Sequence, residues 1–304
     1  MSVIVSIGMP VYNRPIEMIR ALDSILNQSF TNFELIISND NSPNAEIDLI
    51  IRRYADNDSR IIYYKQDISL RTVKNFYFVL KQAKGKYFMW LADDDWVDSN
   101  YIENCFNFLE INLEYSICEG KCIYHENGIE INSNTSRSYE SANKLIRLFS
   151  YFYNVSLNGY LYGLIRKSCL DEIKFENEIG YDWEIVGSLF YQGKIMVLNT
   201  TSHYITKGGV SNQSNSLNSY FDKSNFISRN FIGLGSSLNC SLYIFKSKVY
   251  NLNIFSKILV SITIFLAAYL NTFKWDLLQL KRKAVIFLKI NKNGVVFNSK
   301  KQVN

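Results

Sequence analysis

Apolar and polar residues alternate in regular blocks through the first hundred positions. Short runs of branched apolar residues, typical of buried strands, are separated by longer stretches with apolar residues at helical spacing. Strands are expected at 3–7, 33–37, 61–64 and 87–91, and helices at 15–26, 45–54 and 73–82. This alternation predicts a mostly parallel α/β sheet with helices on both faces.

Polar side chains follow each of these expected strands. Parallel α/β sheets bind ligands beyond the carboxyl ends of their strands. The residues at those four ends, in chain order, are Asn13 with Arg14, then Asp40, then Asp67, and finally Asp93, Asp94 and Asp95. The sequence therefore predicts one ligand site on a single rim of the sheet.

The carboxylate run Asp93-Asp94-Asp95 is the strongest chemical feature of this rim. Adjacent carboxylates repel one another, and a divalent cation relieves that repulsion. Mg²⁺ and Mn²⁺ prefer oxygen ligands, commonly one or two carboxylates together with phosphate oxygens. The alternative is an acidic turn that caps the next helix. The position at a strand end beside Asp40 favours the metal site.

The pattern is looser after residue 100. Helices are expected at 101–109, 143–153 and 183–191, a strand at 116–124, and a hairpin turn at Asn127-Gly128. We interpret this part as a mixed extension of the first sheet. The five cysteines lack a regular spacing and are expected to be reduced thiols. The N-terminus has no signal-peptide pattern, which predicts a cytoplasmic location.

The C-terminal region differs in charge from the rest of the chain. From Lys246 onward there are eleven Lys and Arg and one acidic residue, Asp276, which gives +10; the preceding part carries 22 basic and 27 acidic residues, which gives −5. Residues 258–273 contain no charge, but this run is shorter than the ~20 residues of a membrane-spanning helix. The pattern predicts a helix lying in the plane of an anionic membrane surface. The alternative is a helix packed on the core.

Four motifs in the first half occur in a recognisable order. They are Pro10-Val11-Tyr12-Asn13-Arg14, Ser38-Asn39-Asp40-Asn41-Ser42, Lys74-Asn75, and Gly85-Lys86-Tyr87 leading to Leu91-Ala92-Asp93-Asp94-Asp95. Over residues 2–110 the chain resembles the family 2 glycosyltransferases of the GT-A fold. The resemblance implies a catalytic domain at 1–215, with a nucleotide-binding half (1–110) and an acceptor half (111–215). A helical, basic, membrane-associating region would follow at 216–304.

The resemblance also implies a role for each matching residue. Pro10, Tyr12, Asn13 and Arg14 would line the nucleotide pocket, Asp40 would accept a hydrogen bond from the base, Lys74 would reach the phosphates, Asp93 would hold the ribose, and Asp94 or Asp95 would bind Mn²⁺ or Mg²⁺. Two positions depart from the family pattern. Ala92 stands where the usual D-x-D motif begins, and Asn39 replaces a frequent aspartate.

A second segment, Gly180-Tyr181-Asp182-Trp183-Glu184, resembles the family segment that carries the catalytic base, with Tyr181 in place of the usual glutamate. Transfer with inversion needs a carboxylate to take the proton of the acceptor hydroxyl. Asp182 and Glu184 are two residues apart and do not share a helix face. We therefore assign the base to Asp182 and an accessory place to Glu184. Asp182 is also suited to cap the next helix.

The segment Lys207-Gly208-Gly209-Val210-Ser211 resembles a family segment that closes over the donor. His203, just before it, is either an accessory ligand of metal or phosphate or a hydrogen-bonded structural residue. Other mechanisms lack their motifs, because the sequence has no G-x-G-x-x-G, P-loop or G-x-S-x-G. The acidic body argues against nucleic acid as a partner.

These features together predict an inverting, metal-dependent glycosyltransferase, peripheral on the inner face of a bacterial cell membrane. Its donor would be a UDP-linked sugar. Its acceptor would be a glycan or polyprenyl-linked glycan of lipopolysaccharide, O-antigen or capsule synthesis. Two alternatives remain: a non-catalytic, membrane-peripheral protein that binds nucleotide sugars, and a nucleotidyltransferase on a similar fold.

Overall fold

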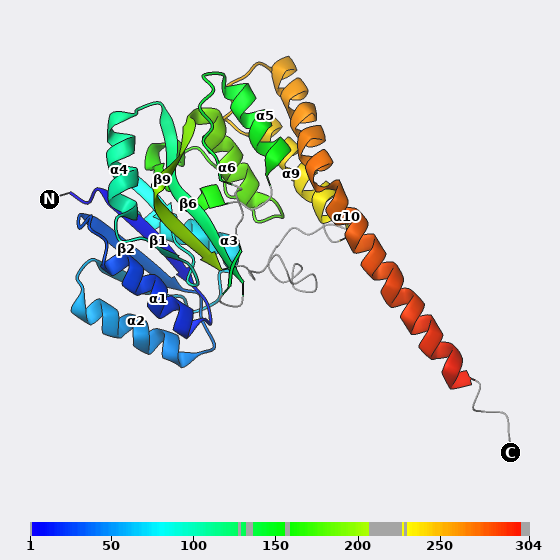
Figure 1. Cartoon of the computed structure of the whole chain (residues 1–304), viewed down its shortest axis with the longest axis horizontal. Helices are drawn as coiled ribbons and strands as arrows, with labels where there is room; N and C mark the ends of the chain where they lie inside the picture. The colour runs from blue at the N-terminus through cyan, green and yellow to red at the C-terminus, as the bar shows by residue number, and fades with distance from the viewer. Residues whose placement is uncertain are drawn as a thin grey trace.

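The structure, a computed structural model, describes residues 2–126, 129–131, 136–155, 159–206, 227 and 230–298, with side chains described as far as residue 281. A single twisted sheet lies between two layers of helices, and a long C-terminal helix extends away from the body (Figure 1). The described residues thus form the mixed α/β arrangement that the strand and helix pattern predicts.

The first half alternates strands and helices. Its elements are β1 (Val5–Val11), α1 (Pro15–Leu26), β2 (Phe33–Asn39), α2 (Ala45–Asn57), β3 (Ile61–Lys65), α3 (Thr72–Gln82) and β4 (Tyr87–Trp90). The four strands are parallel and lie in the order β3-β2-β1-β4. All seven expected elements are confirmed, with ends that differ by a few residues. Strand β1 runs on to Val11, so Pro10 is inside it.

The same sheet continues through the second half. Strand β4 is followed by β8 (Leu164–Arg166), β6 (Tyr115–Glu126), β9 (Lys194–Thr206) and β5 (Trp96–Val97), while β7 (Ile129–Ile131) pairs with β6. Strand β8 is antiparallel to both of its neighbours. The expected extension of the sheet is therefore confirmed. The pattern missed β9, because the polar run Asn199-Thr200-Thr201-Ser202 interrupts its apolar residues.

Each face of the sheet has its own hydrophobic core. On one face the sheet packs against α1, α2 and α4 (Tyr101–Ile111), with α4 lying against β6, β8 and β9. On the other face the sheet packs against α3, α5 (Lys144–Asn154) and α6 (Tyr181–Gln192), together with α9 (Ile232–Lys246) and part of α10 (Ile254–Asn298). Two short 3₁₀ helices, Gly159–Tyr162 and Lys167–Cys169, lie beside β8.

The C-terminal helices share the second core. Ile264, Ala267 and Ala268 of α10 are buried with residues of α5, α6 and α9. The carboxylate of Asp276 accepts hydrogen bonds from the backbone N–H groups of Gly233 (2.9 Å) and Leu234 (3.0 Å), at the first turn of α9. One face of α10 is therefore part of the folded body. The expected domain boundary at 215/216 lies outside the described residues.

The other face of α10 is exposed and apolar. The residues on this face, which we call the α10 stripe, are Phe255, Ile258, Leu259, Ile262, Leu266, Leu270, Phe273, Leu277 and Leu280. Their spacing of mostly three or four residues places them along one side of the helix. By length and composition, Ile254–Leu278 is the one described segment that could cross a membrane.

Candidate active site

Asp93 is the most tightly held member of the carboxylate run. It follows β4 and is buried. Its Oδ2 accepts a hydrogen bond from the backbone N–H of Tyr12 (2.8 Å), and its Oδ1 accepts one from Nη1 of Arg14 (2.9 Å). Burial raises the pKa of Asp93 to about 6, although the charge of Arg14 and the Tyr12 hydrogen bond act in the opposite direction. The loops after β1 and β4 are thus joined as the sequence predicts.

Asp94 is held from two sides. Its carboxylate oxygen Oδ2 lies 2.8 Å from Nη1 of Arg14, and its backbone carbonyl accepts hydrogen bonds from Thr206 Oγ1 (2.6 Å) and Arg20 Nη2 (3.0 Å). Burial, followed by the nearby charge of Asp95, raises the pKa of Asp94 to about 7. A carboxyl group in this environment binds a proton or another cation readily.

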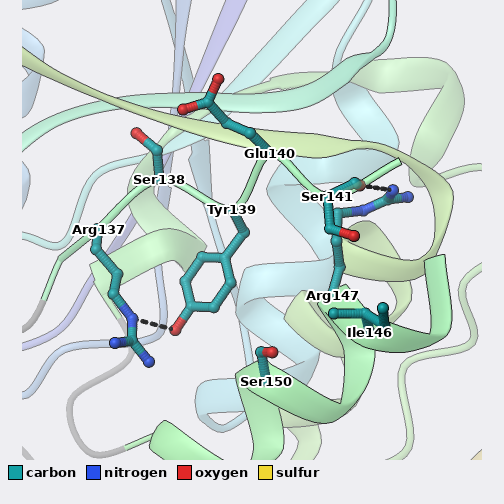
Figure 2. A pocket seen from close by; sticks show the side chains of 8 residues that line it. All are labelled: Arg137, Ser138, Tyr139, Glu140, Ser141, Ile146, Arg147 and Ser150. Atoms are coloured by element: carbon teal, nitrogen blue, oxygen red, sulfur yellow. Dashed lines mark hydrogen bonds between the residues drawn. The ribbon is translucent and has the colours of Figure 1, made fainter. Parts of the chain in front are cut away.

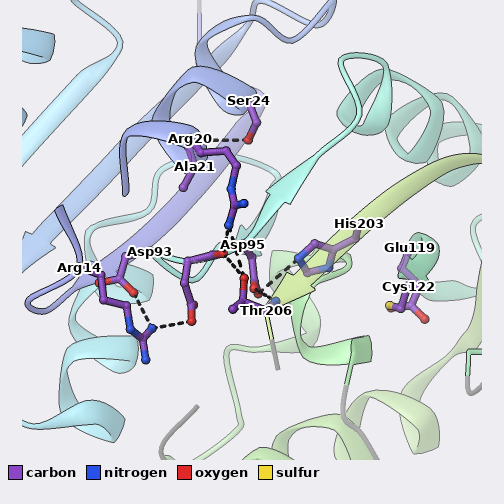
Figure 3. Close-up of polar contacts among 11 residues, drawn as sticks. Arg14, Arg20, Ala21, Ser24, Asp93, Asp95, Glu119, Cys122, His203 and Thr206 are labelled. Carbon is purple, nitrogen blue, oxygen red and sulfur yellow. Dashed lines mark hydrogen bonds and ion pairs between the residues drawn. The ribbon is translucent and has the colours of Figure 1, made fainter. Parts of the chain in front are cut away.

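Both carboxylate oxygens of Asp95 contact residues of β9. Its Oδ1 accepts a hydrogen bond from the backbone N–H of Thr206 (2.8 Å), and its Oδ2 lies 3.5 Å from Nε2 of His203 (Figure 3). His203 is fully buried in β9, with its ring edge against Tyr101 and Tyr162. Asp95 therefore ties the carboxylate run to the end of β9. His203 is a partner of Asp95 in this structure.

Sequence reasoning missed two residues that fix the backbone of the run. Arg20 of α1 places its guanidinium 3.5 Å from the ring centroid of Trp96, and that ring stacks on Tyr204 at 5.1 Å. A cation stacked on an aromatic face contributes about 0.5–2 kcal/mol. Thr206 ends β9 beside the run. Nothing in the local sequence marks either residue, because both act through tertiary contacts.

Asp40 anchors the turn that precedes α3. Its Oδ1 accepts a hydrogen bond from the N–H of Leu70 (2.5 Å), and its Oδ2 accepts from Ser69 Oγ (2.8 Å) and from the N–H of Arg71 (3.1 Å). Arg71 has a φ of 66°, in the left-handed region that favours glycine. Burial raises the pKa of Asp40. Asp40 therefore shapes this turn, and its contact with a base stays a prediction.

The remaining residues of the expected donor site lie around this rim. The ring of Tyr12 is 53% exposed at the end of β1, whereas Pro10 is buried inside the strand. Asn13 has a φ of 54° and turns the chain into α1, a conformation that asparagine tolerates well. Lys74 is exposed in the first turn of α3.

Asp182 lies in the first turn of α6, in the second half of the chain. Burial, and then the charges of Asp95, Tyr181, Asp94 and Asp182, raise the pKa of Tyr162. Asp182 does not cap its helix. The capping position of α6 belongs to Gly180, whose φ of 92° and close approach to Ser236 of α9 favour glycine.

Glu184 lies deeper in the protein than Asp182. It is almost fully buried in α6, and Asp182 is partly exposed. Burial, followed by the charges of Glu178 and Glu176, raises the pKa of Glu184 well above its usual range. The two carboxylates therefore have different environments, as their spacing on a helix requires. The expected closing segment 207–211 and the turn at Asn127-Gly128 lie outside the described residues.

The donor set fits a divalent cation that binds together with phosphate. Within the described ranges, no group of three or more His, Cys, Asp or Glu side chains converges as a metal cage. One or two buried carboxylates are nevertheless what Mg²⁺ and Mn²⁺ use when phosphate oxygens complete their shell. The guanidinium of Arg14 already occupies a cation's place between Asp93 and Asp94.

A pocket of about 360 Å³ is lined by residues of the second half of the chain (Figure 2). Its lining includes Arg137, Tyr139, Glu140 and Arg147. Tyr139 pairs with Ile195 at the start of β9, whereas Asp95 contacts the opposite end of that strand. Arg147 donates its hydrogen bonds to backbone carbonyls, among them that of Phe190. The pocket is therefore separate from the carboxylate site.

The family model for glycosyl transferase family 2 matches residues 6–174 of the chain, which is more than half of its 304 residues. The chain belongs to glycosyl transferase family 2. This match includes β1 to β4, the carboxylate run and β8, and it ends before Asp182. The expected family is therefore confirmed, and the site residues stay predictions.

The chain is similar to curated proteins that carry glycosyltransferase or polymer-biosynthesis names. It is 28% identical over 195 residues to the minor teichoic acid biosynthesis protein GgaB of Bacillus subtilis (strain 168), covering 62% of this chain and 21% of GgaB. It is 31% identical over 210 residues to an uncharacterized glycosyltransferase of Rickettsia bellii (strain RML369-C), covering 67% of this chain and 29% of that protein. The chain thus spans less than a third of these relatives.

The fold is similar to that of S. aureus TarS. The structure of TarS residues 1–349 matches with a TM-score of 0.64 at 17% identity, covering 88% of this chain and 72% of that one. The TarS structure in complex with UDP-GlcNAc matches with a TM-score of 0.63 at 16% identity, covering 88% of this chain and 72% of that chain. At 16–17% identity, this similarity shows a shared fold and nothing about substrates.

Proposed function

We propose that the protein transfers a sugar, with inversion, from a UDP-linked donor to a glycan acceptor. The observation that carries this proposal is the pair Asp93 and Asp94, buried at the end of β4 and joined through Arg14 to the loop after β1. The family match supports sugar transfer. The complexes of TarS with UDP and UDP-GlcNAc support the choice of donor.

The donor would lie across the ends of β1, β2 and β4. The exposed ring of Tyr12 offers a stacking surface for the base, next to the turn that Asp40 holds. Asp93 is positioned by Tyr12 and Arg14 and would hold the ribose hydroxyls. Lys74 would reach the phosphates from the first turn of α3, where the helix N-terminus also favours negative charge.

Asp94 is the preferred ligand for Mn²⁺ or Mg²⁺. Both carboxylate oxygens of Asp95 contact β9, at Thr206 and His203. The carboxylate of Asp94 makes one hydrogen-bond or ion-pair contact with another described residue, and that partner is the partly exposed Arg14. When bound, the cation would neutralise charge on the departing diphosphate.

Asp182 would serve as the general base. It would take the proton of the acceptor hydroxyl while that oxygen attacks the anomeric carbon and the bond to the diphosphate breaks. The charges of Asp182, Asp94 and Asp95 all raise the pKa of Tyr162, which supports this assignment, because base and metal must act on one sugar. The partly buried ring of Tyr162 and the buried ring of Trp183 would help to exclude water from the reaction.

The acceptor would belong to a bacterial cell-surface polymer, as a glycan or a polyprenyl-linked glycan. The name of GgaB, a teichoic acid biosynthesis protein, supports this class. The α10 stripe supports action at a membrane, because it is a long exposed apolar face within a region of net charge +10. Since the opposite face of α10 is packed in the core, we propose that the helix lies on the inner surface of the cell membrane.

The test is release of UDP from a panel of UDP-sugars, with and without Mn²⁺, in the presence of lipid-linked glycan acceptors. Metal-dependent UDP release coupled to a lengthened acceptor is expected. Binding of UDP without any release would instead indicate a non-catalytic binding protein. Release of pyrophosphate from a nucleoside triphosphate would indicate a nucleotidyltransferase.

A further inference from the structure

One nitrogen atom of Arg14 bridges two different aspartates. Its Nη1 lies 2.9 Å from Oδ1 of Asp93 and 2.8 Å from Oδ2 of Asp94. The two carboxylates are buried, with 6% and 10% of their side-chain surfaces exposed, whereas the side chain of Arg14 is 36% exposed. The guanidinium therefore lies on the more exposed side of the pair, and Figure 3 shows it beside Asp93. A divalent cation that binds Asp94 must approach from that same side.

We propose that Arg14 is the resident counter-cation of Asp93 and Asp94, and that it leaves them only when a nucleoside diphosphate and a divalent cation bind together. The inference rests on the proposed function, since it concerns the same site. Buried neighbouring carboxylates are costly unless a cation compensates them. Arg14 supplies that compensation before any ligand arrives.

A divalent cation alone gains little from this site. It must displace a charge-assisted contact, or bind beside the positive guanidinium. Few further ligands are offered to it, because the described residues contain no converging group of three or more His, Cys, Asp or Glu side chains. Water would have to fill most of the coordination shell. Binding of the metal by itself is therefore expected to be weak.

The diphosphate should strengthen the binding of the divalent cation in two ways. Its oxygens complete the shell of the cation, and they also give the guanidinium a new partner, since arginine binds phosphate through two parallel hydrogen bonds. The backbone of Arg14 is fixed between Asn13, with its φ of 54°, and Pro15 at the start of α1. The guanidinium can therefore move by side-chain rotation alone. Metal and nucleotide should then favour each other's binding equally.

The experiment measures Mn²⁺ binding to the full chain by electron paramagnetic resonance of free Mn²⁺, with and without saturating UDP. Binding of Mn²⁺ to UDP in buffer is subtracted. For the wild type, UDP should raise the affinity for Mn²⁺ by about 10-fold or more, within the usual range of coupling between sites. Arg14→Gln should bind Mn²⁺ without UDP about 10-fold more tightly than the wild type, and UDP should then add less.

Two control variants show whether an effect on Mn²⁺ binding comes from the positive charge at position 14. Arg14→Lys keeps the positive charge and should resemble the wild type in the absence of UDP. Arg52→Gln removes an arginine from an exposed ion pair with Asp48 on α2 (3.1 Å) and should leave Mn²⁺ binding unchanged. Thermal unfolding of each variant checks that it is folded.

Equal Mn²⁺ affinities of the wild type and Arg14→Gln without UDP would overturn the inference and leave the proposed function intact. If Arg14→Gln does not fold, the wild type decides, because an Mn²⁺ affinity that UDP does not change also overturns it. Absence of Mn²⁺ binding even with UDP would overturn both the inference and the metal dependence.

Discussion

The carboxylate of Asp95 and the backbone N–H of Thr206 form a 2.8 Å hydrogen bond across 111 residues of sequence. A second hydrogen bond, from Thr206 Oγ1 to the carbonyl of Asp94, runs parallel to it. The two contacts fix the loop after β4 to the last residue of β9. Asp95 and Asp94 therefore have different contacts, since the carboxylate of Asp95 holds the loop and that of Asp94 contacts the partly exposed Arg14.

Asp94→Asn should abolish metal-dependent transfer while leaving the fold intact. The loss in kcat/KM should be at least ~100-fold, because a catalytic cation supplies several kcal/mol of charge stabilisation. The free energy of unfolding without metal should not fall, because burial already disfavours the charged form of Asp94 and raises its pKa to about 7. Urea unfolding and UDP release measure the two effects. A turnover equal to that of the wild type would reject Asp94 as the ligand.

Asp95→Ala should act on stability as well as on activity. It removes the acceptor of the partly buried Thr206 N–H, and the loss of one such hydrogen bond costs about 0.5–1.5 kcal/mol. Urea unfolding should therefore separate this variant from Asp94→Asn. Unchanged stability of Asp95→Ala would contradict the anchoring role. Thr206→Val, which keeps the backbone N–H, is the matched control for the Asp95 contact.

Asp182→Asn should spare donor binding and remove transfer. The amide cannot take the acceptor proton, and the loss of a general base lowers kcat by about 10²–10⁴-fold. Affinity for UDP, measured by calorimetry, should stay within about 2-fold of the wild type, because the base does not contact the nucleotide in the proposed site. Glu184→Gln provides the comparison. If Asp182→Asn turns over normally while Glu184→Gln does not, the base must be reassigned to Glu184.

Glu119 should make the protein less stable as pH rises. It is fully buried in β6, with Oε2 3.7 Å from Sγ of Cys122, and burial raises its pKa from 4.5 to about 8. The folded state therefore holds the proton more tightly than the unfolded state. The resulting stability is complete below about pH 4.5 and is lost as pH rises through 8.

Glu119→Gln should flatten this dependence. Between pH 6 and pH 8 the free energy of unfolding of the wild type should fall by about 2 kcal/mol more than that of the variant. Urea unfolding at the two pH values measures the difference. Glu46→Gln, a substitution of an exposed glutamate on α2, should behave as the wild type. Parallel pH profiles for the wild type and Glu119→Gln would contradict the prediction.

Substitutions on the α10 stripe should release the protein from membranes. Leu270 is 71% exposed and Leu266 is 52% exposed, so Leu266→Glu and Leu270→Glu should weaken co-sedimentation with phosphatidylglycerol vesicles by about 10-fold or more. Thr263→Glu adds the same charge at an exposed position beside the stripe and should have a smaller effect. Removing the whole tail is a poorer test, because Tyr250, Ile264 and Ala267 belong to the core.

Unchanged vesicle binding by Leu266→Glu and Leu270→Glu would reject the stripe as the membrane surface. Light scattering of the same variants then tests whether the α10 stripe binds a second copy of this chain instead of a membrane. A change from dimer to monomer would indicate that the stripe binds another copy of this chain.

The sequence was sufficient to predict the first half of the fold and the convergence of Arg14, Asp93 and Asp94 at one rim of the sheet. Parallel strands are buried on both faces, so their apolar runs are continuous, and polar residues begin only where each strand ends. Arg14 and Asp93 could therefore be assigned to one rim from their positions alone. The family motifs added roles to these residues.

Tertiary structure decided which groups the carboxylates contact. Nothing near Asp95 in sequence indicates that Thr206 donates a hydrogen bond to it or that His203 lies beside it, because β9 reaches the site through its pairing with β5 and β6. Gly180 occupies the capping position of α6, where Ser236 of α9 approaches closely and favours glycine.

The charge and apolar pattern of the tail left a core helix and a membrane helix as alternatives. Packing against α9 through Asp276 showed that one face of α10 belongs to the core, and the α10 stripe is the face left exposed. Local sequence determines which segments form strands and helices, since periodicity and strand ends are local properties. The partners of Asp94, Asp95 and α10 depend on how distant elements pack, which only the three-dimensional arrangement determines.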